Sequence, residues 1–394
     1  MSAMKPLRIL MLTTVRFHNS KGGTEKVMID TANAMAERGH HVVILYKDKN
    51  GDTPGFPLNE SVKTFNCYHE KIPFSVSGLM RMLRSFSFSR EKHKQKLAFL
   101  KLKKLACTFK SKLIENPADI YITYEPKLSA MLLREFQIKN NVITTFQFSP
   151  QYIANRSDTK YLEPDICGAG PIQVLRNEFS ATTKKLFHSA QDIIVIPNAV
   201  TPNNCKSTLS NKTIINVGRV IPQKNQALLA EAFGQINNKY KDWQIQIWGE
   251  DNLDKKYSTL IKRIIQQHNM QNQFKLCGPT DNVYEKLREA SIFVFPSIHE
   301  GFGLALGEAM ATGLACIGLK SCTAVNSLIR HRENGLLCDN DKDALAECLS
   351  QLIDSYDLRK KFAENALNDI SNYYPENIWK IWEDTLYKYS LKKI

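Results

Sequence analysis

Two glutamates, Glu300 and Glu308, flank a glycine-bearing segment that carries no charged side chain, residues 301–307. Paired carboxylates are the groups with which glycosidases cleave a sugar bond, and they then stand about 5 to 9 Å apart on either side of that bond. Here a loop and a predicted helical turn separate the two acids. We therefore interpret them as contacts with opposite ends of one ligand rather than as an acid and its base.

The surrounding sequence, SIFVFPSIHEGFGLALGEAMATG, predicts a buried strand, a loop that holds Glu300, and a helix that begins near Leu304 and ends at Gly313. Unpaired amides at the start of a helix favour a negatively charged group. The plainer alternative is that Glu300 caps this helix and that Gly301 and Gly303 supply only a turn.

Two further loops follow predicted strands. In VGRVIPQKN, residues 217–225, Arg219 and Lys224 lie on one proline-containing turn, which lets both cations approach the same anion. In NSKGGTEK, residues 19–26, Gly22 and Gly23 precede a predicted helix and leave backbone amides open to a phosphate or sugar. A solvated surface and ordinary turn chemistry are the respective alternatives.

The elements that must position these loops alternate between strands and helices along the chain. Residues 8–15 read as a buried strand, residues 24–38 as an amphipathic helix that Gly39 ends, and residues 41–46 as the next strand. The other predicted strands are 119–124, 141–146, 193–197, 213–217, 243–248, 274–277, 292–296 and 315–319. This alternation predicts parallel sheets with helical crossovers.

A stretch rich in Pro, Asn, Ser and Thr, residues 197–212, separates the two series of strands and has a linker composition. We predict an α/β fold of two Rossmann-like, doubly wound domains, 1–197 and 198–375, facing each other across a cleft. Residues 376–394 are expected to form a C-terminal helix that crosses back to the first domain. Ligands of such sheets bind beyond the carboxyl ends of the strands, where the three loops lie.

Composition excludes several classes. The chain has 394 residues, no apolar stretch near the roughly 18 needed to span a bilayer, and no signal peptide, so we expect a cytoplasmic protein. The nine cysteines are scattered without a Cys-x-x-Cys pair, which argues against disulfides and zinc. The net charge of +14 is concentrated in the first half, and residues 76–114 hold eleven Lys and Arg against one acid, Glu91. Such a patch indicates a polyanion or an anionic membrane.

Together these motifs resemble the family-4 retaining glycosyltransferases of GT-B fold, the glycosyl transferases group 1. The resemblance rests on segments in the expected order: GGTEKVMIDTANAMAERGHHVVIL, VIPN, INVGRV..QKN, FVFPSIHEGFGLALGEAMATG and ENGLLCDNDKDALAECLSQLI. The Glu300-to-Glu308 element between its strand and helix is the specific part. Residues from about 50 to 185 carry no motif of the family.

The resemblance implies a nucleotide-sugar donor, a role for each loop, and no divalent metal or other cofactor. Arg219 and Lys224 would neutralise the donor diphosphate, with Glu300 beside the sugar as the third catalytic residue, and Glu308 would accept hydrogen bonds from the ribose. The remaining donor contacts expected from the resemblance are Gly22, Gly23, Gly218, and the amides of Phe302, Gly303 and Leu304. The first domain would bind the acceptor and the second the donor.

One position departs from the family. Members often carry a histidine after the strand that here ends ITTFQFSP, where this chain has Gln147. Glutamine donates a hydrogen bond but is neither acid nor base, so we expect Gln147 to contact the acceptor only. His18, beyond the first strand, is interpreted as a surface loop residue.

The basic segment has an apolar face, Ala98, Leu102, Leu105, Phe109 and Leu113, with lysines elsewhere, the pattern of an interfacial helix. Any helix that covers a sheet also needs such a face. We expect residues 76–114 to make a peripheral contact with the anionic inner face of the cell membrane, because acceptors in this family are often lipid-linked or envelope glycans.

The resulting prediction is a retaining hexosyltransferase that uses a nucleotide-diphosphate sugar, UDP-linked, and a glycan or glycolipid acceptor in cell-envelope polysaccharide or lipopolysaccharide synthesis. The alternatives are a nucleotide-sugar epimerase of similar architecture and a basic, non-catalytic nucleic-acid-binding protein, although no nucleic-acid motif supports the latter. A metal-dependent transferase would need Asp341-Lys342-Asp343 as its metal motif, and these residues read better as a helix N-cap. A dehydrogenase would need a third glycine where Leu306 stands.

Overall fold

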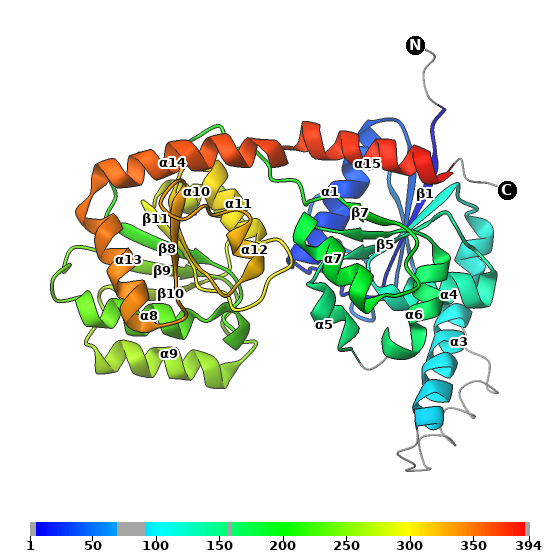
Figure 1. Ribbon diagram of the computed structural model, residues 1–394, viewed down its shortest axis with the longest axis horizontal. Coiled ribbons are helices and arrows are strands. Elements are labelled where there is room, and N and C mark those ends of the chain that lie inside the picture. Colours follow the sequence, from blue (N-terminus) through cyan, green and yellow to red (C-terminus); the bar gives the residue numbers. More distant parts are fainter. Residues whose placement is uncertain (1–4, 69–90, 157–158, 391–394) are drawn as a thin grey trace. The chain divides into compact units, whose positions relative to one another are not determined.

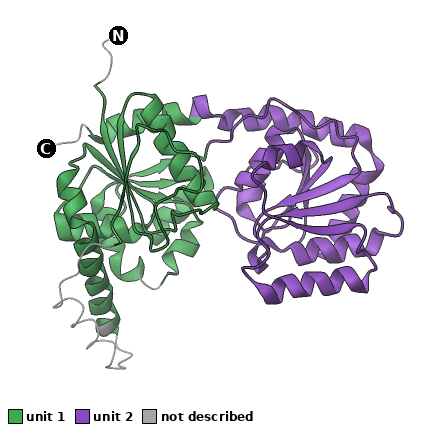
Figure 2. Cartoon of the chain, turned by 180° about the vertical axis from the view of Figure 1, so that it is seen from behind, with its two compact units in different colours: residues 1–198, 378–394 green, residues 199–377 purple. Residues whose placement is uncertain are grey.

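The computed structural model describes residues 5–68, 91–156 and 159–390, and the chain divides into two compact units (Figure 2). Unit 1 holds the described residues of 1–198 and of 378–394, and unit 2 is Ala199–Asn377. The division falls inside the last helix, α15 (Pro375–Ser390), so unit 1 is built from both ends of the chain.

Unit 1 contains a seven-stranded parallel sheet in the order β3-β2-β1-β4-β5-β6-β7 (Figure 1). Its strands are β1 (Arg8–Thr13), β2 (His41–Tyr46), β3 (Lys63–Asn66), β4 (Ile120–Thr123), β5 (Val142–Phe146), β6 (Ile172–Val174) and β7 (Ile193–Val195). Its helices besides α15 are α1 (Gly23–Glu37), α3 (Glu91–Glu115), α4 (Pro126–Phe136), α5 (Pro150–Ala154), α6 (Thr159–Ala169) and α7 (Asn177–Leu186). The strand order reverses between β1 and β4, which makes their carboxyl ends the switch point at which such sheets bind ligands.

Unit 2 repeats this plan with a six-stranded parallel sheet in the order β10-β9-β8-β11-β12-β13. Its strands are β8 (Thr213–Val217), β9 (Gln244–Trp248), β10 (Phe274–Gly278), β11 (Ile292–Phe295), β12 (Ala315–Leu319) and β13 (Gly335–Cys338). Its helices are η1 (Pro222–Lys224), α8 (Gln226–Ile236), α9 (Lys255–Gln267), α10 (Val283–Arg288), α11 (Leu304–Ala311), α12 (Thr323–Asn326), α13 (Lys342–Asp354), α14 (Tyr356–Ile370) and η2 (Ser371–Tyr373). Here the switch point lies between β8 and β11.

The predicted α/β class with two Rossmann-like sheets is therefore confirmed, and every predicted strand is present. Three strands were missed. β6 has only three residues and follows Pro171, β13 is a short strand that begins at Gly335, and β3 is a half-buried edge strand. β3 and β6 contain polar residues and β13 begins with a glycine, so none of the three shows the apolar run by which the other strands were predicted.

The core of each unit follows from strands that are apolar on both faces. On β1, Leu10 and Leu12 pack with residues of α3, α4 and α6, while the alternate residues Ile9 and Met11 are buried on the opposite face. Burial on both faces is what a parallel sheet covered by helices on each side requires. In unit 2, α8 and α9 cover one face of the sheet and α10 and α11 lie on the other (Figure 1).

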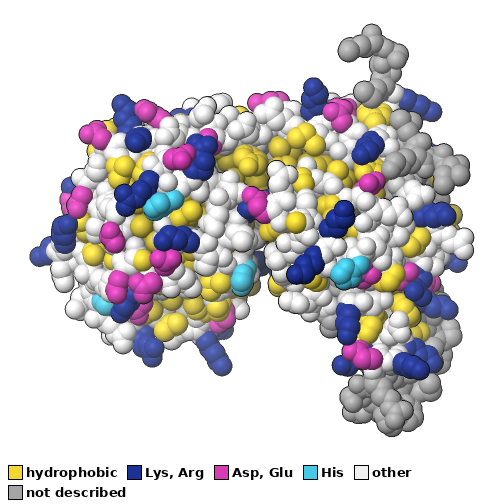
Figure 3. Space-filling view, viewed as in Figure 1, with side chains coloured by type: hydrophobic (Ala, Val, Ile, Leu, Met, Phe, Trp, Pro, Cys, Tyr) yellow, Lys and Arg dark blue, Asp and Glu magenta, His cyan; other side chains and the backbone are white. Residues whose placement is uncertain are grey.

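The apolar face of the basic helix α3 belongs to this core. Ala98, Leu102, Phe109 and Leu113 are buried against the sheet and α4, and Leu105 packs against them. The interpretation of this face as a membrane-inserting surface is therefore wrong, because a side chain packed into the core is not available to lipid. Lysines of α3 remain exposed and gather along this helix (Figure 3). Of the basic segment, residues 76–90 lie outside the described residues.

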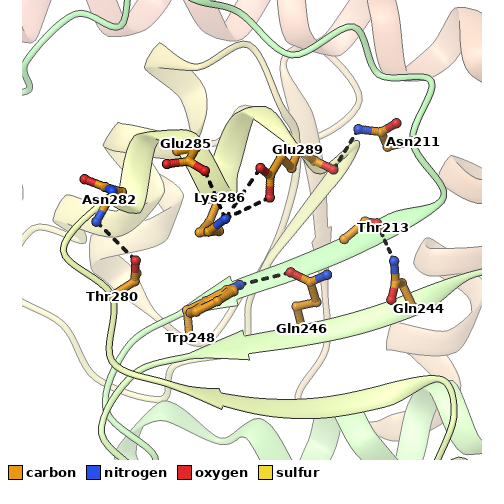
Figure 4. Close-up of polar contacts among 10 residues, drawn as sticks. All are labelled: Asn211, Thr213, Gln244, Gln246, Trp248, Thr280, Asn282, Glu285, Lys286 and Glu289. Atoms are coloured by element: carbon orange, nitrogen blue, oxygen red, sulfur yellow. Dashed lines mark hydrogen bonds and ion pairs between the residues drawn. The ribbon is translucent and has the colours of Figure 1, made fainter.

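One face of β9 in unit 2 is polar rather than apolar. Ile245 and Ile247 are fully buried in the core, whereas Gln244, Gln246 and Trp248 point to the face beneath α10 (Figure 4). The indole Nε1 of Trp248 donates to Gln246 Oε1 at 3.0 Å. On α10, Lys286 pairs with Glu285 and Glu289, each at 3.2 Å. This face is thus held by polar contacts as well as by apolar packing.

A buried histidine fastens α15 to unit 1. The Leu7 amide donates to Nδ1 of His40 at 3.1 Å, which leaves Nε2 to carry the proton and donate to Glu383 of α15 at 3.3 Å. Arg38 adds an ion pair to the same glutamate, 3.7 Å long. Burial lowers the pKa of His40, an effect that Glu383 opposes in part.

We expect this contact to make unit 1 less stable at mildly acidic pH. The pKa of His40 is lower in the folded chain than the ordinary value near 6.5, so the unfolded chain takes up the proton first as the pH falls. Stability is then lost progressively below about pH 6.5, by at most about 1.4 kcal/mol per unit of depression. Calorimetric Tm values at pH 7.5 and 5.5 measure this loss. A His40→Gln variant should lack this part of the pH dependence, while exchange of the exposed His41 for Gln should preserve it.

All nine cysteines are free thiols, as expected. Asp341 caps α13 by accepting hydrogen bonds from the amides of Asp343 and Ala344 at 2.8 and 3.1 Å, which confirms the N-cap reading of the Asp-x-Asp motif. Across the described ranges, no helix has both the length and the apolar content to cross a bilayer.

Candidate active site

The loop after β8, which carries Arg219 and Lys224, begins with a tight turn. The Gly218 amide donates to Trp248 O at 2.9 Å, and a Cβ on Gly249 would lie 2.1 Å from Gly218 O, so the ends of β8 and β9 approach closely only because Gly249 has no side chain. The turn η1 then carries the chain to Lys224. Asn225 closes it in the left-handed conformation, at φ +55°, which asparagine tolerates.

Lys224 and Glu300 meet at the switch point of unit 2. Their Nζ and Oε1 atoms are 2.5 Å apart, and the two side chains are only 17% and 13% exposed. One residue follows β8 and the other follows β11, whose carboxyl ends are neighbours in the sheet. These two residues, which the sequence predicts to share a site, thus form a direct ion pair. Because both side chains are mostly buried, the pair is partly shielded from water and from salt.

The loop that carries Glu300 is fastened to the turn that carries Lys224. Ile298 donates its amide to Gln223 O at 2.9 Å, and Gln223 Nε2 donates to His299 O at 2.7 Å. These two bonds run in opposite directions between the same two segments. They fix the ion pair's two backbones relative to each other, which is the preorganisation that electrostatic catalysis requires.

Arg219 stands apart from this pair. Its side chain is exposed and forms no ion pair with the residues that the structure describes, while its carbonyl accepts from Gln226 Nε2 at 3.0 Å. The backbone is thus fixed and the guanidinium faces solvent. An exposed arginine on this loop is suited to binding two oxygens of an incoming phosphate.

Helix α11 begins at Leu304, as predicted, from Gly303 in the left-handed conformation at φ +91°. A Cβ on Gly303 would also lie 3.4 Å from the ring of Phe295. Both the backbone conformation and this close approach therefore favour glycine. No side chain caps this helix, which leaves first-turn amides to other acceptors. The aromatic ring of Phe302 is buried against Tyr373, so any ligand contact by Phe302 is made by its backbone. Glu308 lies one turn into α11 and is half-buried.

The glycines predicted in the first loop lie in unit 1 and already have a neighbour. Glu25 folds its carboxylate back over Gly22, where a Cβ would lie 2.4 Å from Oε2, and Ser20 donates to the other oxygen at 2.7 Å. Gly23 begins α1. The N-terminal turn of α1 thus has a carboxylate of its own, and an incoming anion would have to displace it.

Glu125, which was not predicted from the sequence as a site residue, anchors the same loop at the switch point of unit 1. This buried carboxylate follows β4, accepts from the Thr14 amide at 2.7 Å and from the Thr14 hydroxyl, and pairs with Lys127 at 3.3 Å. The sequence does indicate such a residue, because TYEP, residues 123–126, places an acid directly after an apolar strand. His18 also serves the loop, since its Nδ1 accepts from the Thr53 amide at 3.3 Å.

Gln147 follows β5, as predicted, and is half-buried. Its amide Nε2 is shielded from water and has no hydrogen-bond partner among the described residues. An unsatisfied buried amide costs about 1 to 3 kcal/mol, a cost that a ligand oxygen would remove. Within the described ranges, no three His, Cys, Asp or Glu side chains are grouped so as to hold a metal ion.

Comparison with known proteins agrees with this geometry. Residues 203–369, nearly all of unit 2, match the family model described as glycosyl transferases group 1. The second unit is thus similar to a group 1 glycosyltransferase domain. The whole-chain comparisons extend over both units.

An uncharacterized glycosyltransferase of Haemophilus influenzae is 27% identical over 93% of this chain and 97% of its own length. The UDP-Gal:alpha-D-GlcNAc-diphosphoundecaprenol alpha-1,3-galactosyltransferase of Escherichia coli is 31% identical over 48% of this chain, which spans 52% of that enzyme. Among solved structures, sucrose-phosphate synthase from Thermosynechococcus elongatus superposes with a TM-score of 0.76 at 17% identity, over 96% of this chain and 98% of the other. The fold is that of the GT-B glycosyltransferases, and the family match favours a transferase over both alternatives.

Proposed function

We propose that the protein transfers a hexose-type sugar, with retention of configuration, from a UDP-sugar to a glycan or lipid-linked glycan acceptor in cell-envelope polysaccharide or lipopolysaccharide synthesis. The observation that carries this proposal is the Lys224 and Glu300 pair at the switch point of unit 2, beside exposed Arg219 and the uncapped start of α11. The name of the Escherichia coli relative, which includes a UDP-sugar and a diphosphoundecaprenol acceptor, supports the choice of substrates.

In this proposal the two cations act on the leaving diphosphate. Lys224 has three donors, so it is able to keep its contact with Glu300 while it donates to a phosphate oxygen. The exposed guanidinium of Arg219 donates two further hydrogen bonds to the diphosphate. Charge on the leaving group grows in the transition state, so fixed cations accelerate the step without a metal. The acceptor attacks on the face that the diphosphate leaves, and the departing phosphate takes the acceptor's proton.

A screen of nucleotide sugars tests this function. We expect a UDP-hexose to raise the Tm of the protein and to be hydrolysed slowly without acceptor, with the rate unchanged by EDTA. Release of UDP and free sugar, followed by chromatography, measures it. Epimerised donor instead of hydrolysis would point to an isomerase, and no change in any of a panel of UDP-, GDP- and ADP-sugars would overturn the proposal.

Replacing Glu308 with alanine should mainly weaken nucleotide binding. Glu308 is proposed to accept hydrogen bonds from the ribose hydroxyls, and bonds to a charged acceptor contribute about 1.5 to 3 kcal/mol, or about 10- to 100-fold in Kd. Calorimetric titration with UDP measures the affinity, and kcat at saturating donor should change little. Glu347→Ala, at an exposed glutamate of α13, is the matched control. Unchanged UDP affinity in Glu308→Ala would contradict the role.

We also propose that exposed lysines of α3 hold the protein on anionic lipid, by charge alone, since the apolar face of the helix is buried. Each lysine near such a surface contributes about 1 kcal/mol, so changing Lys101, Lys103 and Lys110 to Gln should reduce binding to phosphatidylglycerol vesicles about 100-fold at low salt. Sedimentation with the vesicles measures the bound fraction. The same change at three exposed lysines of α9, Lys255, Lys256 and Lys262, should have little effect. Equal losses in both triple variants, or no binding by the native protein, would exclude the contact.

A further inference from the structure

Unit 1 exposes a pair of aromatic side chains directly after β5. Phe148 and Tyr152 are 38% and 55% exposed, and their ring centroids lie 5.1 Å apart with the planes tilted by 42°. Large aromatic side chains bury 150–250 Å² each when covered, so most soluble proteins turn them inward. Two such rings held together in solvent form a small apolar surface with two faces.

The backbone beneath the pair is fixed rather than loose. Ser149 caps α5, accepting the Tyr152 amide at 3.4 Å, and Pro150 occupies the first helical position. Pro150 and Ile153 are buried, and α5 packs against α7. The exposure of the rings is therefore a property of a capped and anchored turn, and a ligand that binds them does not have to order the chain first.

A polar donor adjoins the rings in the chain. Gln147, the residue between β5 and Phe148, has an amide Nε2 that is shielded from water and that no described residue satisfies. Whichever way the amide is turned, one of its polar atoms stays at this position. The segment 147–152 thus combines two aromatic faces, a phenolic hydroxyl and an unsatisfied amide, and carries no charged side chain.

We propose that Phe148 and Tyr152 form a platform for the sugar ring of the acceptor, with Gln147 as a donor to one of its hydroxyls. A pyranose presents polarised C–H bonds on its faces and hydroxyls around its edge, which match the negative face of an aromatic ring and the amide. A purely apolar partner would leave the amide unsatisfied, and an anionic one would find no cation in this segment. The platform lies at the carboxyl edge of the sheet, where such folds bind their ligands.

This assignment rests on the proposed transfer reaction, since it names where the acceptor of that reaction lies. Phe148→Ala and Tyr152→Ala should each raise the KM for a saccharide acceptor about tenfold, as the loss of an aromatic anchor does at other interfaces. Hydrolysis of the donor without acceptor should keep its native rate in both variants, because neither ring is among the donor contacts proposed above. Tyr152→Phe keeps the ring and should stay within about twofold of native.

Saturation-transfer NMR with methyl α-glycosides of glucose, galactose and N-acetylglucosamine tests the platform without any reaction. We expect saturation of the ring C–H protons of at least one glycoside by the native protein and its loss in both alanine variants. Ile381→Ala, which removes another exposed apolar side chain of unit 1, should keep the native signal. No signal from the native protein, or equal signals from the alanine variants, would overturn the platform.

The two proposals fail in different ways. Aromatic-dependent saccharide binding without hydrolysis of any nucleotide sugar would overturn the proposed function and leave the platform as a saccharide-binding site. The platform alone would be overturned if all variants hydrolysed the nucleotide sugar at the native rate and also bound saccharides as the native protein does. Hydrolysis at that rate also shows that the alanine variants are folded.

Discussion

Replacing Lys224 with alanine is expected to lower kcat by about 10²- to 10³-fold, the loss typical of removing one fixed group that stabilises transition-state charge. The structural reason is the 2.5 Å pair with Glu300. Without Lys224, a mostly buried carboxylate is left unpaired beside the leaving diphosphate, so one positive charge is lost and one negative charge is exposed to it. Because that charge matters most in the transition state, KM for the donor should change less than kcat.

Steady-state kinetics with the donor identified by the screen measure the effect, and two variants sharpen it. Lys286→Ala also removes a lysine paired with two glutamates in unit 2, but on α10, and should turn over normally. Lys224→Ala combined with Glu300→Gln removes the unpaired carboxylate and should recover the stability that the single variant loses. Native turnover in Lys224→Ala would exclude this lysine from the chemical step.

The largest expected loss of stability follows from Arg359→Ala, at about 2 to 4 kcal/mol. This buried guanidinium, on α14, donates to the carbonyls of Leu352 and Ile353 at 2.6 and 3.1 Å and of Leu209 at 3.1 Å. The first two are carbonyls at the end of α13 that have no partner within their own helix. Burial lowers the pKa of Arg359, and yet at neutral pH it remains charged.

Truncation leaves three buried carbonyls unsatisfied and opens a cavity beside Trp243, whose ring centroid lies 5.4 Å from the guanidinium carbon. Urea denaturation of unit 2, followed by tryptophan fluorescence, measures the change. Lys360→Ala, at the next and exposed position, should stay within about 0.5 kcal/mol of native. Arg359→Lys should fall between them, since one ammonium does not reproduce the planar fork. A loss below 0.5 kcal/mol in Arg359→Ala would show that the three bonds contribute little.

The loops of unit 2 were predictable because each follows a buried, largely apolar strand and carries its polar residues immediately afterwards. Glu300 and Lys224 are 76 residues apart in sequence, and their meeting follows from strand order alone, which the alternating pattern implied. The start of α11 at Leu304 followed from Gly303 in the same way.

Other features depended on contacts that a pattern does not encode. The amphipathic pattern of α3 is the same for a helix packed on a sheet and for one lying on a membrane, so the identity of its partner had to come from the fold. The carboxylate of Glu25 over Gly22 depends on a side-chain rotamer. The exposure of Phe148 and Tyr152 was invisible because aromatic residues near a strand are usually buried.

The helix α15 has a practical consequence for engineering this chain. It begins in the second unit and ends bonded to the first, where Tyr389 donates to Asp192 at 3.1 Å and Tyr387 donates to Lys5 O at 3.0 Å. A chimera that exchanges acceptor specificity with a relative therefore needs two junctions, one near residue 198 and one near 377, so that both chain ends come from the same parent. A single-junction chimera would pair a foreign helix with His40, and an N-terminal fragment ending at residue 198 would lack that helix entirely.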